Sequence, residues 1–387
     1  MGKFELKGHN LLFWKPSSKH ISSKLLAIDL DHTFIKPKSG AILPKDLDDW
    51  KLCYEDLSAI EKYQADGYSI IFMTNQKIIN TPYKLESFKH KWQAILEFMK
   101  SNYPQINVNT WGLIASLISD IYRKPSIGMW NFAIAEYNDG MNYSLESSLF
   151  VGDAAGRTTD FSPADIMFSM NVGCKYMLPE VFFTGEKAKK LQSDYLIASI
   201  QKNTKYFNPA KFIAEYNQNP PPIIPDLTEL RACRLVIMVG AQASGKSTFC
   251  KKYMADYKYM NNDTFSGTTA KFRKTVEKLL SAGNSVVIDN TNPSAEGRAK
   301  WLELSKLYKI QCGMAYMTAT ENRLYVEHMF RLRNILEIQT VPSIALRVFY
   351  KKFQKPSHLE GFQTICEIPL ILDFDVITLK QFQWWLD

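Results

Sequence analysis

The residues from Gly240 to Ser247, GAQASGKS, have the spacing of a phosphate-binding loop. The apolar run 235–239 before them predicts a buried strand, and a helix is expected from Thr248 onward. Gly240 and Gly245 let backbone N–H groups turn toward an anion at the start of that helix, where the helix dipole adds positive charge. The pattern therefore predicts a site for a nucleoside triphosphate.

In such a loop, Lys246 reaches the β- and γ-phosphates and the Ser247 hydroxyl binds Mg²⁺. A second predicted strand, 285–288, ends at Asp289, where a carboxylate can assist either Mg²⁺ or the catalytic base. We therefore predict that ATP and Mg²⁺ are bound by Gly240, Ser244, Gly245, Lys246, Ser247, Thr248 and Asp289.

Two further features of this half could take part in phosphoryl transfer. Asp263, in the stretch MNNDT, could accept a proton from an attacking hydroxyl. Arg331 and Arg333 lie on a helix predicted over 327–334, where arginines can form a lid over a triphosphate. A solvated helix face is the competing interpretation of these two arginines.

In the other half of the chain, two carboxylates end an apolar run. Residues 24–30, KLLAIDL, predict a buried strand, and Asp29 and Asp31 lie at its carboxyl end, where α/β sheets place their sites. Their side chains point the same way because they are two residues apart. One carboxylate of such a pair can attack or bind a metal while the other transfers protons.

Companion residues follow in order. Thr74 ends the apolar run 68–73, Lys124 stands in the sequence RKP, and Asp153 follows a short strand predicted over 148–151. This succession resembles the four motifs of the haloacid dehalogenase phosphatase superfamily. In that superfamily the matching residues are a nucleophilic and an acid/base Asp, a phosphate-binding Thr or Ser, a Lys, and a metal-binding Asp.

The resemblance implies a mechanism and a role for each residue. Asp29 would attack the phosphorus and form an aspartyl-phosphate, and Asp31 would protonate the leaving oxygen and later take a proton from water. Mg²⁺ would be held by Asp29, the Asp31 carbonyl and Asp153. Thr74 and Lys124 would hold the oxygens of the transferring phosphoryl group.

Three residues near these motifs are left without an assigned role. His32 stands where the superfamily usually has Gly, and histidine tolerates positive φ better than most residues. A ring that faces solvent is favoured over a catalytic histidine. Asp160 and Asp165, in DFSPAD, are expected in the wall of the site, as partners of either the metal or Lys124.

The strands and helices that position the two sets of site residues are expected to form two domains. With 387 residues, 46% of them hydrophobic and 22% charged, the chain has the composition of a globular protein of two domains. No apolar run has the ~20 residues of a membrane span, and six scattered cysteines without a C-x-x-C pair argue against a structural zinc site. The net charge of +8 is compatible with a polyanionic partner.

A proline-rich stretch separates the halves. NQNPPPIIP, residues 217–225, predicts a stiff, extended connector. We place a phosphatase domain of the haloacid dehalogenase type at 1–219, a linker at 220–230 and a P-loop kinase domain at 231–387. The expected fold class is α/β, with a mainly parallel sheet in each domain.

The two halves together resemble the eukaryotic polynucleotide kinase 3′-phosphatases over nearly the whole chain. The most distinctive matches are RKPSIGMW, VGDAAGR and VVIDNTNP. By this resemblance Asp263 is the base that activates a DNA 5′-hydroxyl, and Arg331 or Arg333 contacts the phosphates. Asn262 departs from the family, which usually has Arg before that Asp. The forkhead-associated domain of the animal enzymes has no counterpart here, as in the fungal enzymes.

The resemblance implies removal of 3′-phosphates and ATP-dependent phosphorylation of 5′-hydroxyls at DNA ends, which include single-strand breaks, nicks, gaps and double-strand breaks. It also implies a nuclear monomer that is not bound to a membrane. Two alternatives stay open. A bifunctional small-molecule kinase and phosphatase would need enclosed acceptor pockets, and an inactive scaffold that binds DNA ends would not need Asp29, Asp31, Lys246 and Asp263.

Overall fold

The computed structural model describes residues 2–42, 44–46, 48–220, 225–338, 341–372, 374 and 376–387. Two compact units are present: residues 1–209 with 383–387, and residues 210–382. The predicted linker 220–230 includes 221–224, which lie outside the described residues, so the predicted domain boundaries stay a prediction. None of the described helices is both long enough and apolar enough to cross a bilayer.

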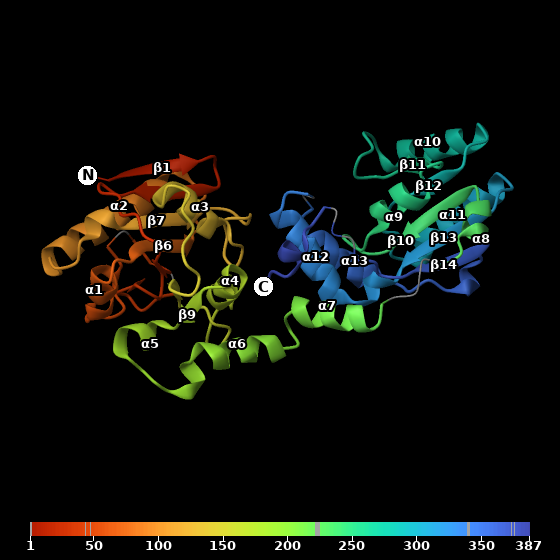
Figure 1. Ribbon diagram of the computed structural model, residues 1–387. Helices are drawn as coiled ribbons and strands as arrows, with labels where there is room; N and C mark the ends of the chain where they lie inside the picture. The colour runs from red at the N-terminus through yellow and green to blue at the C-terminus, as the bar shows by residue number, and fades with distance from the viewer. Residues whose placement is uncertain are drawn as a thin grey trace. The chain divides into compact units, whose positions relative to one another are not determined.

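A seven-stranded sheet forms the centre of the first unit, in the order β1-β2-β7-β6-β3-β8-β9 (Figure 1). The strands from β7 to β9 pair in parallel, and β1 and β2 add an antiparallel edge. The strands are β1 (Lys3–Lys7), β2 (Leu11–Lys15), β3 (Leu25–Ile28), β6 (Ser69–Asn75), β7 (Gly112–Ser116), β8 (Leu149–Val151) and β9 (Lys175–Met177), with a separate small pair, β4 (Ile35–Lys36) and β5 (Lys51–Leu52).

Both faces of this sheet are buried. Successive side chains of a strand point to opposite faces, and each face packs in its own hydrophobic core. Leu26 and Ile28 of β3 face one core, and Leu25 and Ala27 face the other. Helix α2 fills the first core with residues such as Trp92, and α3 and α4 fill the second. The helices are α1 (Ser58–Ala65), α2 (Pro82–Asn102), α3 (Gly128–Tyr137), α4 (Ala164–Val172), α5 (Pro179–Thr184) and α6 (Ser193–Lys202), with 3₁₀ turns at Val108–Thr110 and Lys189–Leu191.

Residues 383–387 complete the first unit, although residues 210–382 separate them from the rest of it in the sequence. Trp385 is buried in the second of the two cores. Its backbone N–H donates to Asn171 Oδ1 at 2.6 Å, and Asn171 Nδ2 donates to its carbonyl at 2.8 Å.

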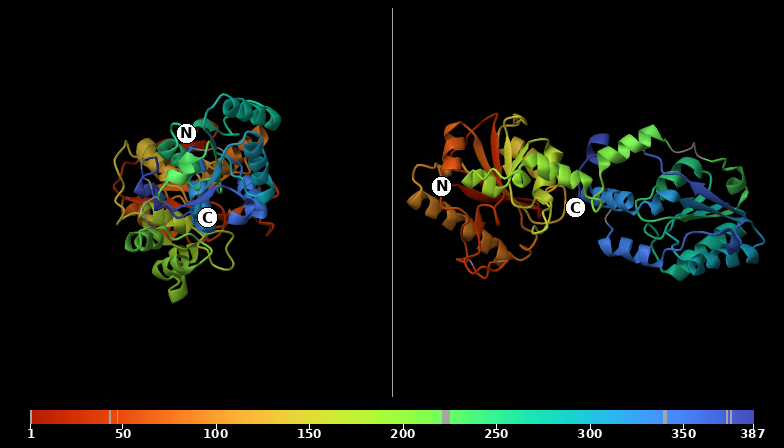
Figure 2. Two further views of the ribbon diagram at one scale, coloured as in Figure 1. Left: turned by 90° about the vertical axis from the view of Figure 1, so that its right-hand side faces the viewer. Right: turned by 90° about the horizontal axis from the view of Figure 1, so that it is seen from below.

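The second unit has a five-stranded, wholly parallel sheet in the order β11-β12-β10-β13-β14 (Figure 1). Figure 2 gives two further views of the same ribbon. Side chains of β10 again alternate between two hydrophobic cores. One core includes residues of α10 and α11, and the other includes residues of α8 and α9. The mainly parallel α/β sheets expected for both halves are therefore confirmed.

The strands of the second unit are β10 (Leu235–Val239), β11 (Lys258–Met260), β12 (Val286–Ile288), β13 (Cys312–Met317) and β14 (Thr364–Ile368). Its helices are α7 (Pro209–Gln218), α8 (Thr228–Ala232), α9 (Lys246–Tyr253), α10 (Thr269–Ser281), α11 (Ala295–Leu307), α12 (Arg323–Ile335), α13 (Ser343–Lys352) and α14 (Leu379–Phe382), with 3₁₀ turns at Thr318–Glu321 and His358–Glu360.

Candidate functional sites

The first site forms near the carboxyl ends of three parallel strands, β3, β6 and β8, of which β6 continues to Asn75. Ile28 of β3 pairs with Phe72 of β6 and Val151 of β8, so the residues that follow these strands share one edge of the sheet. Asp29 follows β3 directly, and its N–H donates to the Val151 carbonyl at 2.8 Å. The register thus brings the polar ends of distant motifs together.

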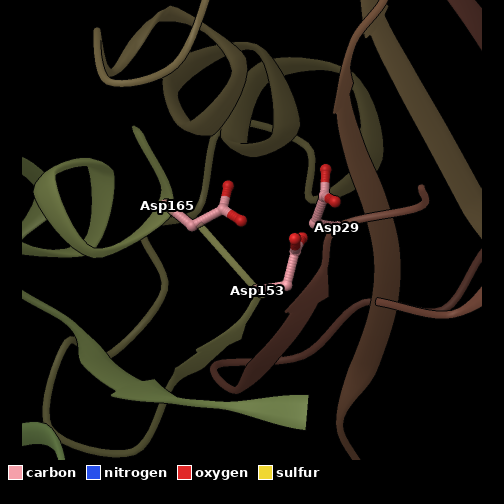
Figure 3. A group of neighbouring side chains, drawn as sticks. All are labelled: Asp29, Asp153 and Asp165. Atoms are coloured by element: carbon pink, nitrogen blue, oxygen red, sulfur yellow. The ribbon is translucent and has the colours of Figure 1, made fainter. Parts of the chain in front are cut away.

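Three carboxylates converge at this edge. Figure 3 shows the side chains of Asp29, Asp153 and Asp165 close together, and each offers an oxygen within 4.8 Å of the others. The Lys124 ammonium lies 2.5 Å from Asp29 Oδ1 and 2.7 Å from Asp165 Oδ1. The sequence left the role of Asp165 open, and the structure makes it the second partner of Lys124.

The charges in this cluster do not balance. Burial raises the pKa of Asp29 well above its usual range, against the lowering effect of Lys124, and Asp165 and Asp153 raise it further. Burial, with Asp165, raises the pKa of Asp153 to about 6. Burial alone would lower the pKa of Lys124, but Asp165 and Asp29 outweigh it and raise that pKa. The cluster therefore fits a divalent cation, which prefers carboxylate oxygens.

Backbone and side-chain bonds hold each of these groups in place. Asn75, at the end of β6, accepts from the Lys124 N–H at 2.9 Å and donates to the Lys124 carbonyl at 3.0 Å. Thr33 Oγ1 donates to Asp153 Oδ1 at 3.1 Å and accepts from the Asp153 N–H at 3.0 Å. A Cβ on Gly152 would lie 2.4 Å from Asp165 Oδ2, so only glycine leaves room for that carboxylate.

Asp31 has surroundings of its own. Gln76 Nε2 donates to Asp31 Oδ2 at 2.5 Å and to Thr74 Oγ1 at 3.0 Å, which ties two predicted site residues together. Lys91 of α2 places its ammonium 3.6 Å from Asp31 Oδ1. Gln76 belongs to the strand-end sequence Thr74-Asn75-Gln76 but had no role assigned to it, and Lys91 lies outside the sequence motifs.

His32 and Asp160 lie beside the cluster. His32 has φ of 62°, its side chain is exposed, and its Nε2 lies 3.1 Å from the Ile42 carbonyl. Asp160 accepts from the backbone N–H groups of Ala155 and Arg157, each at 3.0 Å, and pairs with the Arg157 guanidinium. Asp160 therefore shapes the loop after β8 and does not join the carboxylate cluster.

The second site is the loop between β10 and α9. Positive φ at Gly240, Ala243 and Gly245 curls the backbone there. Helix α9 begins at Lys246, whose ammonium is buried and donates to the Ala241 carbonyl at 2.7 Å. Burial lowers the pKa of Lys246. A phosphate group would supply the negative charge that this buried ammonium lacks.

Asp289, just after β12, faces the loop. Its Oδ2 accepts from Ser247 Oγ at 2.5 Å and from the Tyr259 hydroxyl at 2.6 Å. Its Oδ1 is buried and has no hydrogen-bond partner among the described residues, as is also true of Ser244 Oγ. Unsatisfied polar atoms at this position fit a bound Mg²⁺ and phosphate oxygens. Tyr259 had not been singled out in the sequence.

The remaining predicted residues of this half lie around the loop. Thr248 and Arg333 line a cavity of about 180 Å³ beside it, together with apolar residues that include Met329 and Ile371. Arg331 is outside this lining, and its Nη2 lies 4.0 Å from Glu327. Asp263 follows β11 and is exposed, and its N–H donates to Asn261 Oδ1 at 2.6 Å.

Comparison with known proteins adds the family. Residues 24–183 match the family described as Polynucleotide kinase 3 phosphatase, and residues 235–356 match the AAA domain. The Bifunctional polynucleotide phosphatase/kinase of Schizosaccharomyces pombe is 31% identical over 90% of this chain and 80% of its own length.

Two further relatives match a smaller part of this chain. A Polynucleotide 3′-phosphatase of Saccharomyces cerevisiae is 27% identical over 41% of this chain and 87% of its own length. One of Arabidopsis thaliana is 30% identical over 42% of this chain and 24% of its own length.

Proposed function

Because the chain belongs to the family of bifunctional polynucleotide phosphatase/kinases, we propose that its two sites act on the two ends of a DNA break. The enzyme is a polynucleotide 3′-phosphatase and a polynucleotide 5′-hydroxyl kinase. The observation that carries the proposal is the presence, on one chain, of a Lys124–carboxylate cluster and a phosphate-binding loop that faces Asp289.

At the phosphatase site, Asp29 attacks the phosphorus of a 3′-phosphate and forms an aspartyl-phosphate while the bond to the 3′-oxygen breaks. Asp31 donates a proton to that oxygen and then takes one from the water that hydrolyses the intermediate. Thr74 and Lys124 hold the phosphoryl oxygens. Mg²⁺, when bound by Asp29, Asp153 and the Asp31 carbonyl, supplies positive charge to offset the clustered oxygens.

At the kinase site, the backbone of the loop and Lys246 hold the phosphates of ATP. Ser247 and Asp289 would hold the Mg²⁺ that accompanies it. Asp263 takes the proton from the 5′-hydroxyl as that oxygen attacks the γ-phosphorus, and ADP leaves. We infer that Arg333 contacts the phosphates of ATP, because it lines the cavity beside the loop. Arg331 lies outside that lining.

The products are a 3′-hydroxyl and a 5′-phosphate, which are the ends that a ligase joins. We therefore propose that the protein works in DNA strand-break repair, as a monomer in the nucleus. The net charge of +8 supports a polyanionic substrate over an uncharged small molecule.

One assay tests the proposal directly. A nicked duplex with a 3′-phosphate and a 5′-hydroxyl is incubated with the purified protein, ATP and Mg²⁺, and both ends are followed. Both ends are expected to be converted. If the protein instead phosphorylated a free nucleoside as efficiently as the nick, the small-molecule alternative would replace this proposal.

A further inference from the structure

Two lysines approach the phosphatase site, and they serve different carboxylates. Lys124 Nζ lies within 2.7 Å of Asp29 and Asp165. Lys91 Nζ lies 3.6 Å from Asp31 Oδ1, and Asp31 is its only carboxylate partner within 4.0 Å among the described residues. Lys124 thus contacts the proposed nucleophile, Asp29, and Lys91 lies beside the proposed acid, Asp31.

Lys91 is poorly satisfied for a lysine with so little exposure. Its side chain is 11% exposed. Across the part of the chain that the structure describes, its ammonium meets only Asp31, beyond hydrogen-bond distance, and the Phe88 ring, whose centroid is 5.3 Å away. A desolvated ammonium without hydrogen-bond acceptors is costly, so an anionic ligand here would be bound favourably.

The bonding of Asp31 fixes which of its oxygens faces the leaving group. Gln76 donates an amide N–H to Oδ2 at 2.5 Å. Because an amide nitrogen cannot accept a hydrogen bond, Oδ2 cannot carry a proton that points toward it. The transferred proton is therefore carried by Oδ1. The leaving 3′-oxygen must come within about 3 Å of Oδ1 to receive it, which places it next to Lys91.

The leaving group has a single anionic neighbour. The nucleophile and the leaving oxygen lie on opposite sides of the phosphorus during displacement, so a group beside Asp31 contacts the nucleoside and not the phosphoryl group. In a polynucleotide, the nearest charge on that side is the phosphodiester attached to the 5′-oxygen of the terminal nucleoside. Successive phosphates of one strand are ~3.4 Å apart along the helix axis and about twice as far apart through space, a distance that an extended lysine side chain can span.

We propose that Lys91 binds this penultimate phosphodiester and thereby makes the phosphatase specific for 3′-phosphates of polynucleotides over 3′-mononucleotides. The inference rests on the proposed 3′-phosphatase function and adds to it a residue that determines specificity. It also explains why an ammonium lies beside a carboxylate that has to deliver a proton.

The test compares three substrates that share the same leaving oxygen. They are a 3′-phosphorylated oligothymidylate, thymidine 3′,5′-bisphosphate and thymidine 3′-monophosphate, which lacks the second phosphate. Full-length wild type is compared with Lys91→Met, Lys91→Arg and the control Lys89→Met. Lys89 is on the same helix, but its ammonium pairs with Glu86 at 2.8 Å.

Lys91→Met is expected to lower kcat/KM about 10- to 100-fold for the oligonucleotide and the bisphosphate, mainly through KM, in line with the loss of one charge-assisted hydrogen bond. Hydrolysis of thymidine 3′-monophosphate should stay within about threefold, which also shows that the site is folded. Lys91→Arg should retain most activity, and Lys89→Met should match wild type. The slope of log kcat/KM against log salt for the oligonucleotide should fall by ~0.7 in Lys91→Met.

An equal loss on all three substrates would overturn the inference, because Lys91 would then act on Asp31 or on the phosphoryl group. An unchanged kcat/KM for the oligonucleotide would overturn it as well. Both outcomes leave the proposed function intact provided that wild type hydrolyses the oligonucleotide. Failure of wild type on that substrate would reject the proposed function itself.

Discussion

At the scale of single residues, the phosphatase site is defined by excess negative charge. One ammonium, on Lys124, pairs with Asp29 and Asp165, and Asp153 lies beside them. Burial, together with the neighbouring carboxylates, raises the pKa of Asp29 and that of Asp153. The free energy of this arrangement therefore depends on both protons and cations.

The pKa of Asp153, about 6 against an ordinary value of 3.8, gives this dependence a pH range. A carboxyl with a raised pKa in the folded state favours the folded protein when protonated, so metal-free stability falls as the pH rises from about 4 through 6. Protons compete with Mg²⁺ over the same range, so Mg²⁺ affinity should rise as the pH increases through 6. Calorimetric titration of Mg²⁺ at pH 5, 6 and 8 measures this. Asp153→Asn should weaken Mg²⁺ binding and reduce the dependence, and Asp29, whose pKa is also raised, should account for what is left. A pH-independent affinity in wild type would contradict the prediction.

His32 stands where the superfamily usually has Gly, and the effect of this difference on phosphatase activity can be measured. Its φ of 62° is a conformation that glycine adopts more easily, while its ring contacts only the Ile42 carbonyl among hydrogen-bond partners in the described residues. His32→Gly should keep phosphatase kcat/KM within about tenfold of wild type, or ~1.4 kcal/mol. A loss near a thousandfold, with kinase activity unchanged, would instead show that the imidazole takes part in the chemistry.

At the scale of elements, the site depends on how closely loops approach at the ends of strands. Gly152 follows β8 directly, and the Asp165 carboxylate at the start of α4 occupies the space that a side chain would take. The approach of α4 to β8 therefore sets the distance between Asp165 and Lys124.

Gly152→Ala tests this packing. The new Cβ would lie 2.4 Å from Asp165 Oδ2, so the carboxylate must move away from Lys124. We expect phosphatase kcat to fall at least about 100-fold, since a small displacement in a site of this kind is costly. Kinase kcat, measured on the same preparation, serves as the control and should not change. Full phosphatase activity would mean that α4 can shift without effect.

The sequence was most informative where chemistry coincides with strand ends. The runs before Asp29, Asp153 and Asp289 predict strands, and β3, β8 and β12 are found there. Residues that act through tertiary packing carried no such signal. Lys91 reaches Asp31 because α2 packs over β3 and β6, and a helical lysine with no motif around it looks like a solvated residue. Gln76 directly follows β6, and it reaches Asp31 because β6 pairs with β3. Arg331 is exposed and Arg333 is half-buried, and this difference likewise depends on what α12 packs against.

At the scale of the whole molecule, the two activities rest on separate sheets with separate catalytic groups. Each unit has its own core on both faces of its sheet. Damage to one site should therefore leave the chemistry of the other unaffected.

Single substitutions test this separation. Asp29→Ala should abolish removal of 3′-phosphate and leave 5′ phosphorylation largely intact, because the nucleophile has no part in the kinase site. Lys246→Ala should do the reverse. Both activities are measured on the nicked duplex described above, with circular dichroism to confirm folding. Loss of both activities from either change in a folded protein would be incompatible with two sites.

Trp385 lies near the end of the chain but contributes to the stability of the first unit. It is buried in a core made by residues before 209, and Asn171 bonds to its backbone. Trp385→Ala should lower the unfolding free energy of the first unit by roughly 3–5 kcal/mol, the usual cost of removing a buried tryptophan side chain. Thermal unfolding, followed with phosphatase and kinase assays, should show the phosphatase lost at lower temperature. Equal loss of both activities would contradict this assignment.

The position of Trp385 also has a consequence for biosynthesis. Domains of a nascent chain usually fold in turn, the N-terminal one first, at ~5–20 residues added per second. Here the first unit lacks a core residue until the ribosome has made residues 210–382, which takes roughly ten to forty seconds at that rate. An incomplete chain released in that interval would carry a first unit without Trp385, and its phosphatase should therefore unfold at a lower temperature than that of the full-length molecule.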